Sequence, residues 1–424
     1  MEQKQLFQLA LGLASPWQIS SIAFSLEQKR LDLHIDFEPG SRFCLGGDSP
    51  DTQTYPVHDT TEKEWRHLNF FQHECYLHAR VPRVRLNDNS VHLVTPPWAG
   101  RSFGFTMLLE AFLMPLLQHM AVRQVETLTG ISDDKLWRML ESYVNQAHEQ
   151  LDMSSVNIIG VDETSYGKGH NKFITLFVDP AIPRSLFVTE GKDASTFMAF
   201  KDVLESHGGD TKKVTGITMD MSPAFISGAA KCMPNAEVIF DPFHVVKLFN
   251  GMIDTVRRRE QNEARANEDD EKQALLSGSR WSILKNRENL TDEQAVKLAS
   301  IEMRGRNLQV YRAMKMREGL QDVYGALTER KFKIQLKALV GWMRRSRIKE
   351  AKKLAETVKN HWDGIIAWFK TKASNGILEG MNSLIKAASA RARGFRTFGK
   401  LRIIVYLQTG KLEYGKLNPA MNTH

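Results

Sequence analysis

The sequence predicts a multidomain α+β protein, because its hydrophobic periodicity changes along the 424 residues. Apolar residues alternate at period two within the first hundred residues, and helical spacing begins at about Phe105. Strand-like and helix-like segments alternate over residues 154–256, and residues 257–370 are helical in composition and dense in charge. We therefore expect a small N-terminal β module, a helix-turn-helix region, and a mixed α/β domain interrupted by an all-α insertion.

The β module is assigned to residues 1–104. Apolar and polar residues alternate in part of this segment, which is typical of strands with one buried face. The alternating apolar residues are Leu31, Leu33, Ile35 and Phe37.

Cysteine usage and hydropathy limit the class of protein. The three cysteines are too few and too scattered for a disulfide framework, and none lies in a CxxC pair. They are Cys44, Cys75 and Cys232. The chain has no run of roughly 18 uncharged apolar residues, and its N-terminus lacks the pattern of a secretory signal. We expect a cytoplasmic protein with no disulfide, no zinc and no membrane partner.

Residues 105–153 are predicted to hold two helices joined by a short turn. The first, over residues 121–130, ends at Gly130, and Ser132 caps the second, over residues 133–144. Apolar residues have the spacing that packs such helices together: Val125, Leu128, Ile131, Leu136 and Leu140. A DNA-reading helix-turn-helix requires this pattern, but any helical hairpin shares it.

Residues 154–256 alternate between strands and helices in the order βββαβαβα. Strands are predicted at residues 156–161, 173–178, 185–189, 214–219 and 237–240. One helix is expected at about residues 194–206, and two more begin at Ser222-Pro223 and Asp241-Pro242, where a capping residue precedes a proline. With residues 371–405, this segment forms the predicted mixed α/β domain around the helical insertion at 257–370.

Positive charge is concentrated toward the C-terminus. The formal net charge of +8 is a modest bias. Residues 386–424, however, carry eight basic side chains against one acidic side chain, whereas residues 1–104 carry ten basic against twelve acidic. Such a distribution is typical of a surface that binds nucleic-acid phosphates. Residues 406–424 are expected to form a basic tail.

Two aspartates follow buried strands. Asp162 comes after residues 158–161, and Asp220 comes after residues 217–219. A carboxylate in apolar surroundings needs a partner, a capping role or a metal ion. Asp220 has a capping role available at the helix near Ser222, whereas Asp162 begins no helix.

A third acid lies on the helix predicted after the insertion. Its apolar stripe consists of Ile377, Leu378, Met381, Leu384, Ile385 and Ala388. Glu379, Asn382 and Lys386 fall on the opposite face, which by periodicity alone is either ordinary surface or the wall of a cleft. If this face lines a cleft near the two aspartates, we expect Glu379 to complete an oxygen-rich site of the kind that magnesium prefers. Two such ions can activate a nucleophile and stabilise the leaving oxygen of a phosphodiester.

Four ordered blocks resemble the ISL3 family of insertion-sequence transposases. They are GVDETSYGKGH at 160–170, DMSPAF at 220–225, PNAEVIFDPFHVVK at 234–247, and SNGILEGMNSLIK at 374–386 with GFR at 394–396. The resemblance implies a ribonuclease-H-like catalytic domain with an Asp-Asp-Glu triad and two Mg²⁺ ions, for which Mn²⁺ can substitute. The triad residues, which are also the metal ligands, are then Asp162, Asp220 and Glu379.

Other residues in these blocks have subordinate or rival roles. Asp241 and His244 resemble an Asp-x-x-His signature of related transposases, and with Glu163 they are the rivals if Asp220 is not the middle ligand. We expect DNA contacts from the second helix of the helix-turn-helix, the first block and the C-terminal region. The residues are Lys135, Arg138, Lys168, Asn382, Lys386, Arg391, Arg393, Arg396, Lys400 and Arg402. The helical insertion is expected to line the DNA channel, with Trp281 as a candidate for stacking on a base.

The N-terminus departs from the family. Relatives often carry a zinc-binding module built from paired cysteines, whereas residues 43–48 keep one cysteine and residues 83–88 keep none. We therefore expect a β module that has lost its metal.

The resemblance implies an enzyme that binds the terminal inverted repeats of a bacterial element, cuts its ends and joins them to target DNA. Synapsis of two ends requires at least a homodimer, acting on double-stranded DNA at the nucleoid. Two rivals remain: a structure-selective nuclease or resolvase of the same fold, and a transposase-derived DNA-binding protein without catalysis.

Overall fold

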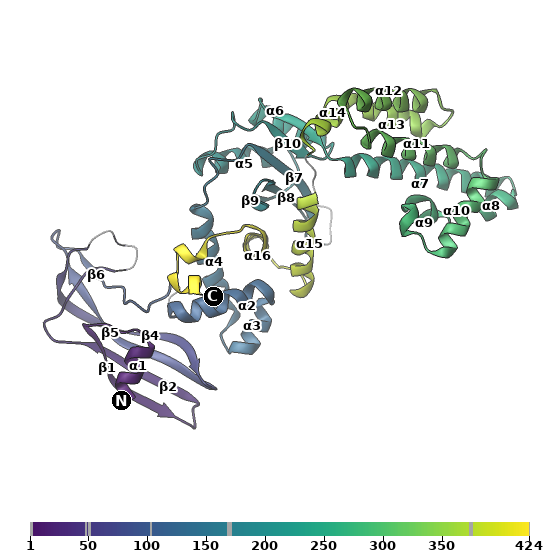
Figure 1. Cartoon of the computed structure of the whole chain (residues 1–424). Helices are drawn as coiled ribbons and strands as arrows, with labels where there is room; N and C mark the ends of the chain where they lie inside the picture. Colours follow the sequence, from purple (N-terminus) through teal and green to yellow (C-terminus); the bar gives the residue numbers. More distant parts are fainter. Residues whose placement is uncertain are drawn as a thin grey trace. The chain divides into compact units, whose positions relative to one another are not determined.

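The computed structural model describes residues 3–46, 49, 52–101, 104–167, 172–372 and 376–423. The chain forms two compact units (Figure 1). The terminal unit comprises residues 1–151 and 385–424, and the central unit comprises residues 152–384. The division falls within α15 (Gly376–Arg391), so this helix contributes residues to both units.

The terminal unit begins with α1 (Gln3–Ala10) and a six-stranded sheet. The strands are β1 (Trp17–Ser25), β2 (Arg30–Phe37), β3 (Arg42–Phe43), β4 (Tyr55–Phe70), β5 (His73–Arg85) and β6 (Val91–Leu93). Their order is β1-β2-β5-β4-β3, and β6 pairs with β5. Burial alternates along β2, which buries the four apolar residues expected from the period-two pattern. One face of the sheet covers an aromatic core that includes Trp17, Trp65 and Trp98.

Four helices complete the terminal unit with the last turn of α15. They are α2 (Met107–His119), α3 (Val122–Thr129), α4 (Asp133–Glu149) and α16 (Phe398–Thr409). The turn between α3 and α4 begins at Gly130, whose φ of 71° lies in the left-handed region. Glycine adopts this backbone conformation without strain because it has no Cβ. Val125 and Leu136 are fully buried between the helices, as expected, but Leu128 is 63% exposed because it lies on the outer face of α3.

The residues expected to form a basic tail are instead folded into the terminal unit. α16 buries most of its apolar side chains, and the following turns η2 (Tyr414–Lys416) and η3 (Pro419–Thr423) place Tyr414 and Leu417 in the core. Asn418 is fully buried, and its Nδ2 donates to the carbonyl oxygen of Met107 at 2.9 Å and to the Tyr143 hydroxyl at 3.0 Å. The prediction of a tail considered only the basic residues of this segment, whereas its apolar residues pack it into the core.

The central unit is built on a five-stranded sheet in the order β11-β10-β7-β8-β9. Its strands are β7 (Ile158–Ser165), β8 (Phe173–Asp179), β9 (Arg184–Glu190), β10 (Gly216–Met219) and β11 (Glu237–Phe240). β7, β8 and β9 form an antiparallel meander, whereas β10 runs parallel to both β7 and β11. The helices α5 (Ser195–Ser206) and α6 (Pro223–Cys232) occupy the connections, in the order that the sequence predicted.

A long helical segment follows β11. It contains α7 (Pro242–Ala266), α8 (Asp270–Leu276), α9 (Arg280–Leu284), η1 (Arg287–Asn289), α10 (Asp292–Arg304), α11 (Gln309–Tyr324), α12 (Glu329–Arg345), α13 (Lys349–Asn360) and α14 (Trp362–Thr371). α7 continues through the predicted boundary at residue 257 because nothing in its sequence interrupts the helix. At the other boundary, α14 packs on β11, where Gly364 lies against the Phe240 ring.

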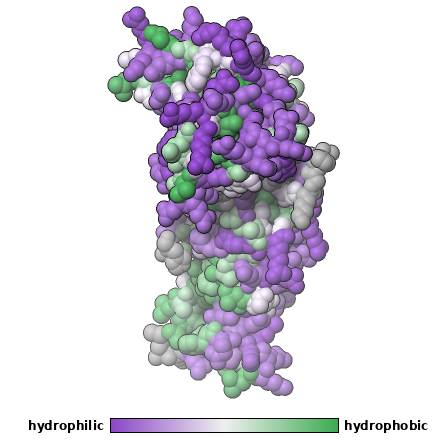
Figure 2. All heavy atoms as spheres, turned by 90° about the vertical axis from the view of Figure 1, so that its right-hand side faces the viewer, coloured by the Kyte–Doolittle hydropathy of each residue, from purple (hydrophilic) through white to green (hydrophobic). Residues whose placement is uncertain are grey.

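One face of the helical segment is largely polar (Figure 2). Figure 2 shows that hydrophilic residues dominate the face of this segment that is turned to the viewer. None of the described helices combines the length and the apolar content that crossing a bilayer requires.

The buried contacts of Asn418 lead to a stability prediction. The Tyr143 hydroxyl donates to Glu110 Oε2 at 2.6 Å, and Glu110 is fully buried, so Asn418 supports a polar cluster that solvent does not reach. We expect Asn418→Ala to lower the free energy of unfolding of the terminal unit by about 1–3 kcal/mol, measured by urea denaturation. The matched control is Lys416→Ala, which changes an exposed side chain two residues away and should cost less than about 0.5 kcal/mol. Equal effects of both substitutions would contradict this account of the segment.

Candidate functional site

Three aspartates lie level with one another on neighbouring strands of the central sheet, where β10 and β11 end. Gly216 pairs with Ile158 and Thr218 pairs with Gly160, so continuing the same register sets Asp220 beside Asp162. Met219 pairs with Phe240, so the next residues along, Asp220 and Asp241, are also level. We call Asp162, Asp220 and Asp241 the aspartate row. Because β7, β10 and β11 are parallel, all three side chains belong to the same end of the sheet.

Asp162 lies inside β7, opposite Leu176 of β8, rather than beyond the strand end as the sequence pattern indicated. Its Oδ1 accepts a hydrogen bond from the Glu163 backbone N–H at 2.9 Å, and its Oδ2 accepts one from Asn382 Nδ2 at 2.7 Å. Burial raises the pKa of Asp162 above its usual value, and the charge of Asp220 acts in the same direction. His244 and the two hydrogen-bond donors act in the opposite direction on this pKa.

Asp241 caps a helix, whereas Asp220 bonds to the capping residue of another helix. Asp220 Oδ1 accepts from the Ser222 backbone N–H at 2.9 Å, at the start of α6. Asp241 is the N-cap of α7, accepts from the Phe243 backbone N–H at 3.0 Å, and is 3% exposed. Ser222 rather than Asp220 is the N-cap of α6, and the one bond from the Ser222 N–H leaves further lone pairs of the Asp220 carboxylate for other partners.

The other two rivals also lie beside Asp162. His244 lies in the first turn of α7 and acts electrostatically on Asp162. Glu163 follows Asp162 in β7 and is half-buried. The rivals named from the sequence are thus neighbours of the same row of acids.

Glu379 occupies the first turn of α15 and is exposed. The preceding residue, Leu378, packs directly on β7, since a Cβ added at Gly160 would lie 2.7 Å from Leu378 Cδ1. Glycine is required there because the helix approaches the strand so closely. Within the described part of the chain, no three His, Cys, Asp or Glu side chains are grouped closely enough to hold a metal ion.

The buried face of α15 differs from the predicted stripe at two positions. Leu384 was expected in the stripe and is 49% exposed, whereas Asn382 was expected on the open face and is 8% exposed. The helix is rotated toward Asn382 because the side-chain amide bonds to Asp162, and that contact is invisible to an apolar periodicity.

The basic residues expected to contact DNA lie mainly in the terminal unit. Lys135 and Arg138 are exposed on α4, and Lys400 Nζ lies 4.8 Å from the centre of the Trp137 ring on the same helix. Arg391 and Arg393 line a hollow of about 880 Å³ together with Arg123 of α3. The helix-turn-helix and the C-terminal arginines thus share one surface.

The remaining basic residues are less closely grouped. Lys386 and Arg396 are exposed, and Arg402 is half-buried on α16. Lys168 lies outside the described residues. Arg391 also donates to the carbonyl oxygen of His119 at 2.5 Å, which orders its side chain against the end of α2.

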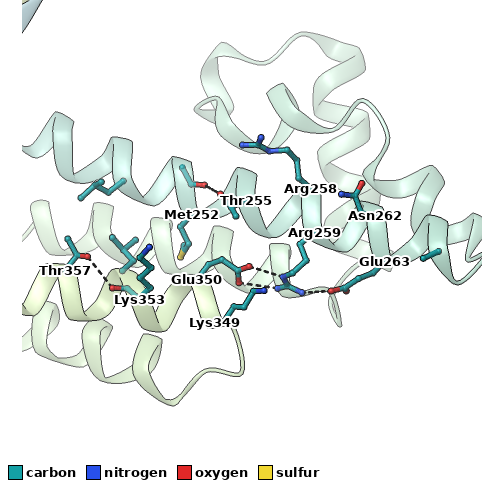
Figure 3. A pocket seen from close by; sticks show the side chains of 14 residues that line it. Met252, Thr255, Arg258, Arg259, Asn262, Glu263, Lys349, Glu350, Lys353 and Thr357 are labelled. Atoms are coloured by element: carbon teal, nitrogen blue, oxygen red, sulfur yellow. Dashed lines mark hydrogen bonds and ion pairs between the residues drawn. The ribbon is translucent and has the colours of Figure 1, made fainter. Parts of the chain in front are cut away.

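A groove of about 1210 Å³ runs between α7 and α13 in the helical segment (Figure 3). Arg259 lies between Glu350 and Glu263, with nitrogen-to-oxygen distances of 2.9 Å to each carboxylate, so its charge is compensated. Lys349 and Lys353 line the opposite wall. Elsewhere in this segment Trp281 is 53% exposed, so it is accessible for the stacking role considered from the sequence.

The environment of Asp162 predicts a gain in stability when its charge is removed. Its raised folded-state pKa means that proton binding stabilises the native state below the ordinary value of 3.8, and that this contribution is lost as pH rises through the folded pKa. We expect Asp162→Asn to raise the free energy of unfolding at neutral pH in EDTA, with the gain shrinking on acidification.

The control for this experiment is Asp152→Asn. The pKa of Asp152 is lowered by the Ser154 backbone N–H, so its ionised form is favoured and its substitution should bring no gain at neutral pH. Urea denaturation over a pH series measures both variants. A loss of stability in Asp162→Asn at neutral pH would show that the carboxylate is not strained by burial.

Two family matches cover the terminal unit. Residues 94–144 match the helix-turn-helix domain of transposase family ISL3, which confirms the DNA-reading interpretation of α3 and α4 over a plain helical hairpin. Residues 51–85 match the zinc finger of the transposases IS204, IS1001, IS1096 and IS1165.

The zinc-finger match corrects our expectation about zinc. The statement that zinc is not expected is wrong, because the segment belongs to a zinc-finger family even though paired cysteines are missing from it. Zinc in structural sites is held by Cys and His. Cys75, the one cysteine of this segment, is buried in β5, and burial raises its pKa to about 12. Among the described residues of this segment, no three His, Cys, Asp or Glu side chains are grouped closely enough to hold the ion.

The central unit and its relatives decide the family. The chain is 28% identical over 361 residues to the transposase for insertion sequence element IS1557 of Mycobacterium tuberculosis, which covers 79% of each chain. It is 28% identical over 355 residues to the transposase for IS1001 of Bordetella parapertussis, covering 80% of this chain and 82% of that one. Residues 159–405, more than half of the chain, match the ISL3 family model described as transposase. Spanning the aspartate row, α15 and the helical segment between them, this match establishes that the protein belongs to the ISL3 family of insertion-sequence transposases.

Proposed function

We propose that this DNA-binding transposase is of the DDE type, and that it cleaves the ends of an insertion sequence and joins the 3′ ends to target DNA. The observation that carries the proposal is the aspartate row, in which Asp162 and Asp220 lie level on neighbouring parallel strands. Leu378, the residue before Glu379 on α15, packs on β7 beside this row. Two-metal catalysis needs several carboxylates close together, and the strand register brings together acids that lie far apart in the chain.

The proposed catalytic fold is ribonuclease-H-like, interrupted by an all-α insertion. The sheet order β11-β10-β7-β8-β9, with an antiparallel meander on one side and parallel strands on the other, supports it. The helices between β11 and α15 support the insertion. We retain the predicted domain boundaries as proposals, except that α16 and the C-terminal turns pack with the helix-turn-helix.

Asp162, Asp220 and Glu379 would hold two Mg²⁺ ions, with Mn²⁺ as a substitute. The chemistry of the donor set suits these ions, because carboxylate oxygens are the ligands of hard cations and because burial raises the pKa of Asp162, whose charge a cation would neutralise. When bound, the ions supply activation of the attacking water or 3′-hydroxyl and stabilisation of the leaving oxygen.

The protein's own contribution is orientation. Asn382 and the Glu163 N–H each hold one oxygen of Asp162, and the Ser222 N–H holds Asp220. These contacts set the direction of the carboxylates before DNA binds, which lowers the reorganisation required at the site.

Terminal inverted repeats are the proposed DNA partner of α3 and α4. Lys135 and Arg138 on α4 would contact the duplex, while Arg391 and Arg393 beside α3 would bind phosphates without reading sequence. In the central unit, Lys349 and Lys353 along the groove would contact the DNA backbone. Two ends must be held together, so the active complex would be a homodimer or larger, working on DNA in the bacterial cytoplasm.

Mapping the reaction products separates this proposal from its rivals. A structure-selective nuclease or resolvase of the same fold would leave cut or exchanged strands, whereas the proposed enzyme joins 3′ ends to new DNA. A catalytically inactive descendant would bind the ends and leave them uncut.

The middle ligand is tested by comparing Asp220→Asn with Asp241→Asn in magnesium-dependent cleavage of the element's ends. We expect Asp220→Asn to lose several kcal/mol of transition-state stabilisation, a rate decrease of about 10³-fold or more, because a metal ligand is lost. Asp241→Asn should retain more activity, since an asparagine also caps a helix. A fully active Asp220→Asn with an inactive Asp241→Asn would assign the role to Asp241 instead.

The proposed phosphate contacts are tested by the salt dependence of end binding. Lys135→Ala and Arg393→Ala should each reduce the slope of log affinity against log salt concentration by about 1, because one phosphate contact is lost. The control is Lys201→Ala, which removes a basic residue of α5 paired with Glu205. Titrations at several salt concentrations provide the slopes, and unchanged slopes in both test variants would exclude these two residues from the interface.

A further inference from the structure

Asn382 is a buried polar residue in which only one of the two side-chain amide atoms, the nitrogen, has a hydrogen-bond partner among the described residues. Its side chain is 8% exposed, and its Nδ2 donates to Asp162 Oδ2 at 2.7 Å. Its Oδ1 is also buried but has no hydrogen-bond partner among the described residues. A buried acceptor without a donor is costly, so such an atom calls for a partner supplied from outside the chain.

Packing alone does not account for this residue. Its buried neighbours on this part of α15 are Leu378, which packs on β7, and Met381, which lies beside Ser185 of β9. The helix therefore presents an otherwise apolar face to the sheet. A leucine at position 382 would have nearly the same shape without an unpaired oxygen. The amide is therefore best explained by what its two ends bind.

The unpaired oxygen lies close to the proposed metal site. The nitrogen and oxygen of an amide are about 2.3 Å apart, so Oδ1 lies within about 5 Å of the Asp162 oxygen that Nδ2 contacts. Magnesium binds oxygen at about 2.0–2.1 Å and keeps several of its waters. These distances allow a water on an ion held by Asp162 to lie within hydrogen-bond reach of Oδ1.

We propose that Asn382 is a positioning residue of the magnesium site, acting through both ends of its amide. Nδ2 fixes the carboxylate of Asp162, and Oδ1 accepts a hydrogen bond from a water bound to the ion. The inference rests on the proposed function, because it requires a cation at Asp162. It makes α15 a source of both a ligand, Glu379, and, one turn later, the residue that orients the ligand on β7.

The first test measures Mn²⁺ binding to the full-length, metal-free protein by calorimetry and by electron paramagnetic resonance. Asn382→Leu keeps the shape of the side chain and should weaken Mn²⁺ affinity by about 10–100-fold, the usual effect of losing a partner behind a metal ligand. Leu384→Ala, on the exposed side of the same helix, should bind Mn²⁺ like the wild type. Asn382→Ala is a second, smaller variant if leucine disturbs packing, and circular dichroism and melting in EDTA report folding.

The second test is the Mg²⁺ dependence of end cleavage. Asn382→Leu should raise the half-saturating Mg²⁺ concentration by about 10–100-fold and recover rate as Mg²⁺ increases. A residue that only fills space would lower the rate at every Mg²⁺ concentration without moving half-saturation, and that result would overturn the inference.

Mn²⁺ binding by the variants distinguishes the role of Asn382 from the existence of the metal site. Wild-type Mn²⁺ affinity in folded Asn382→Leu or Asn382→Ala, together with weakened binding in Asp162→Asn, would overturn the role of Asn382 and leave the proposed metal site intact. Absence of Mn²⁺ binding in the wild type, or unchanged binding in Asp162→Asn, would overturn the proposed metal site and the inference with it.

Discussion

The parallel backbone pairing of β10 with β7 is the constraint on which the candidate site depends. Every hydrogen bond of this ladder holds residues of β10 level with residues 58 positions earlier, as in Gly216 with Ile158. Because the register is shared along the whole pair, it carries Asp220 to the level of Asp162. A shift by one residue would turn the two side chains to opposite faces of the sheet. The charges of the site therefore depend on apolar side chains that hold this register, such as Ile159 and Ile217, both fully buried.

The placement of α15 is the second constraint, and it depends on the first. Leu378 fits against β7 only because Gly160 has no side chain, and Asn382 then meets Asp162 one turn further along the helix. Apolar packing sets how close the helix lies, while the amide sets its rotation. Burial at this position raises the pKa of Asp162, and the charge of Asp220 acts in the same direction.

Two surfaces of the terminal unit differ in how they use charge. On the open face of the N-terminal sheet, basic and acidic residues pair with each other, as Arg30 does with Asp32 and Glu64. Around α3, α4 and the C-terminal arginines, basic side chains remain exposed. Because paired charges offer little net field to a polyanion, the second surface is the better match for DNA phosphates.

Much of the architecture followed from the sequence. Period-two alternation located β2, apolar runs located β7 to β11 in order, and Gly130 marked the turn of the helix-turn-helix. These features are local, because each depends on the spacing of a few neighbouring residues. Ordered motifs likewise pointed to Asp162, Asp220 and Glu379, although periodicity left Glu379 merely available, and the absence of paired cysteines misled us about the zinc-finger segment.

Only the tertiary structure decided the relations between distant residues. It set Asp241 level with Asp220, buried Asn382 against Asp162, and folded the C-terminal segment around Asn418. No periodicity encodes these outcomes, since each arises from a strand register or a polar contact between residues far apart in the chain. The sequence by itself thus determined which elements form and which acids are candidates, whereas packing and hydrogen bonding between elements decided which of them meet.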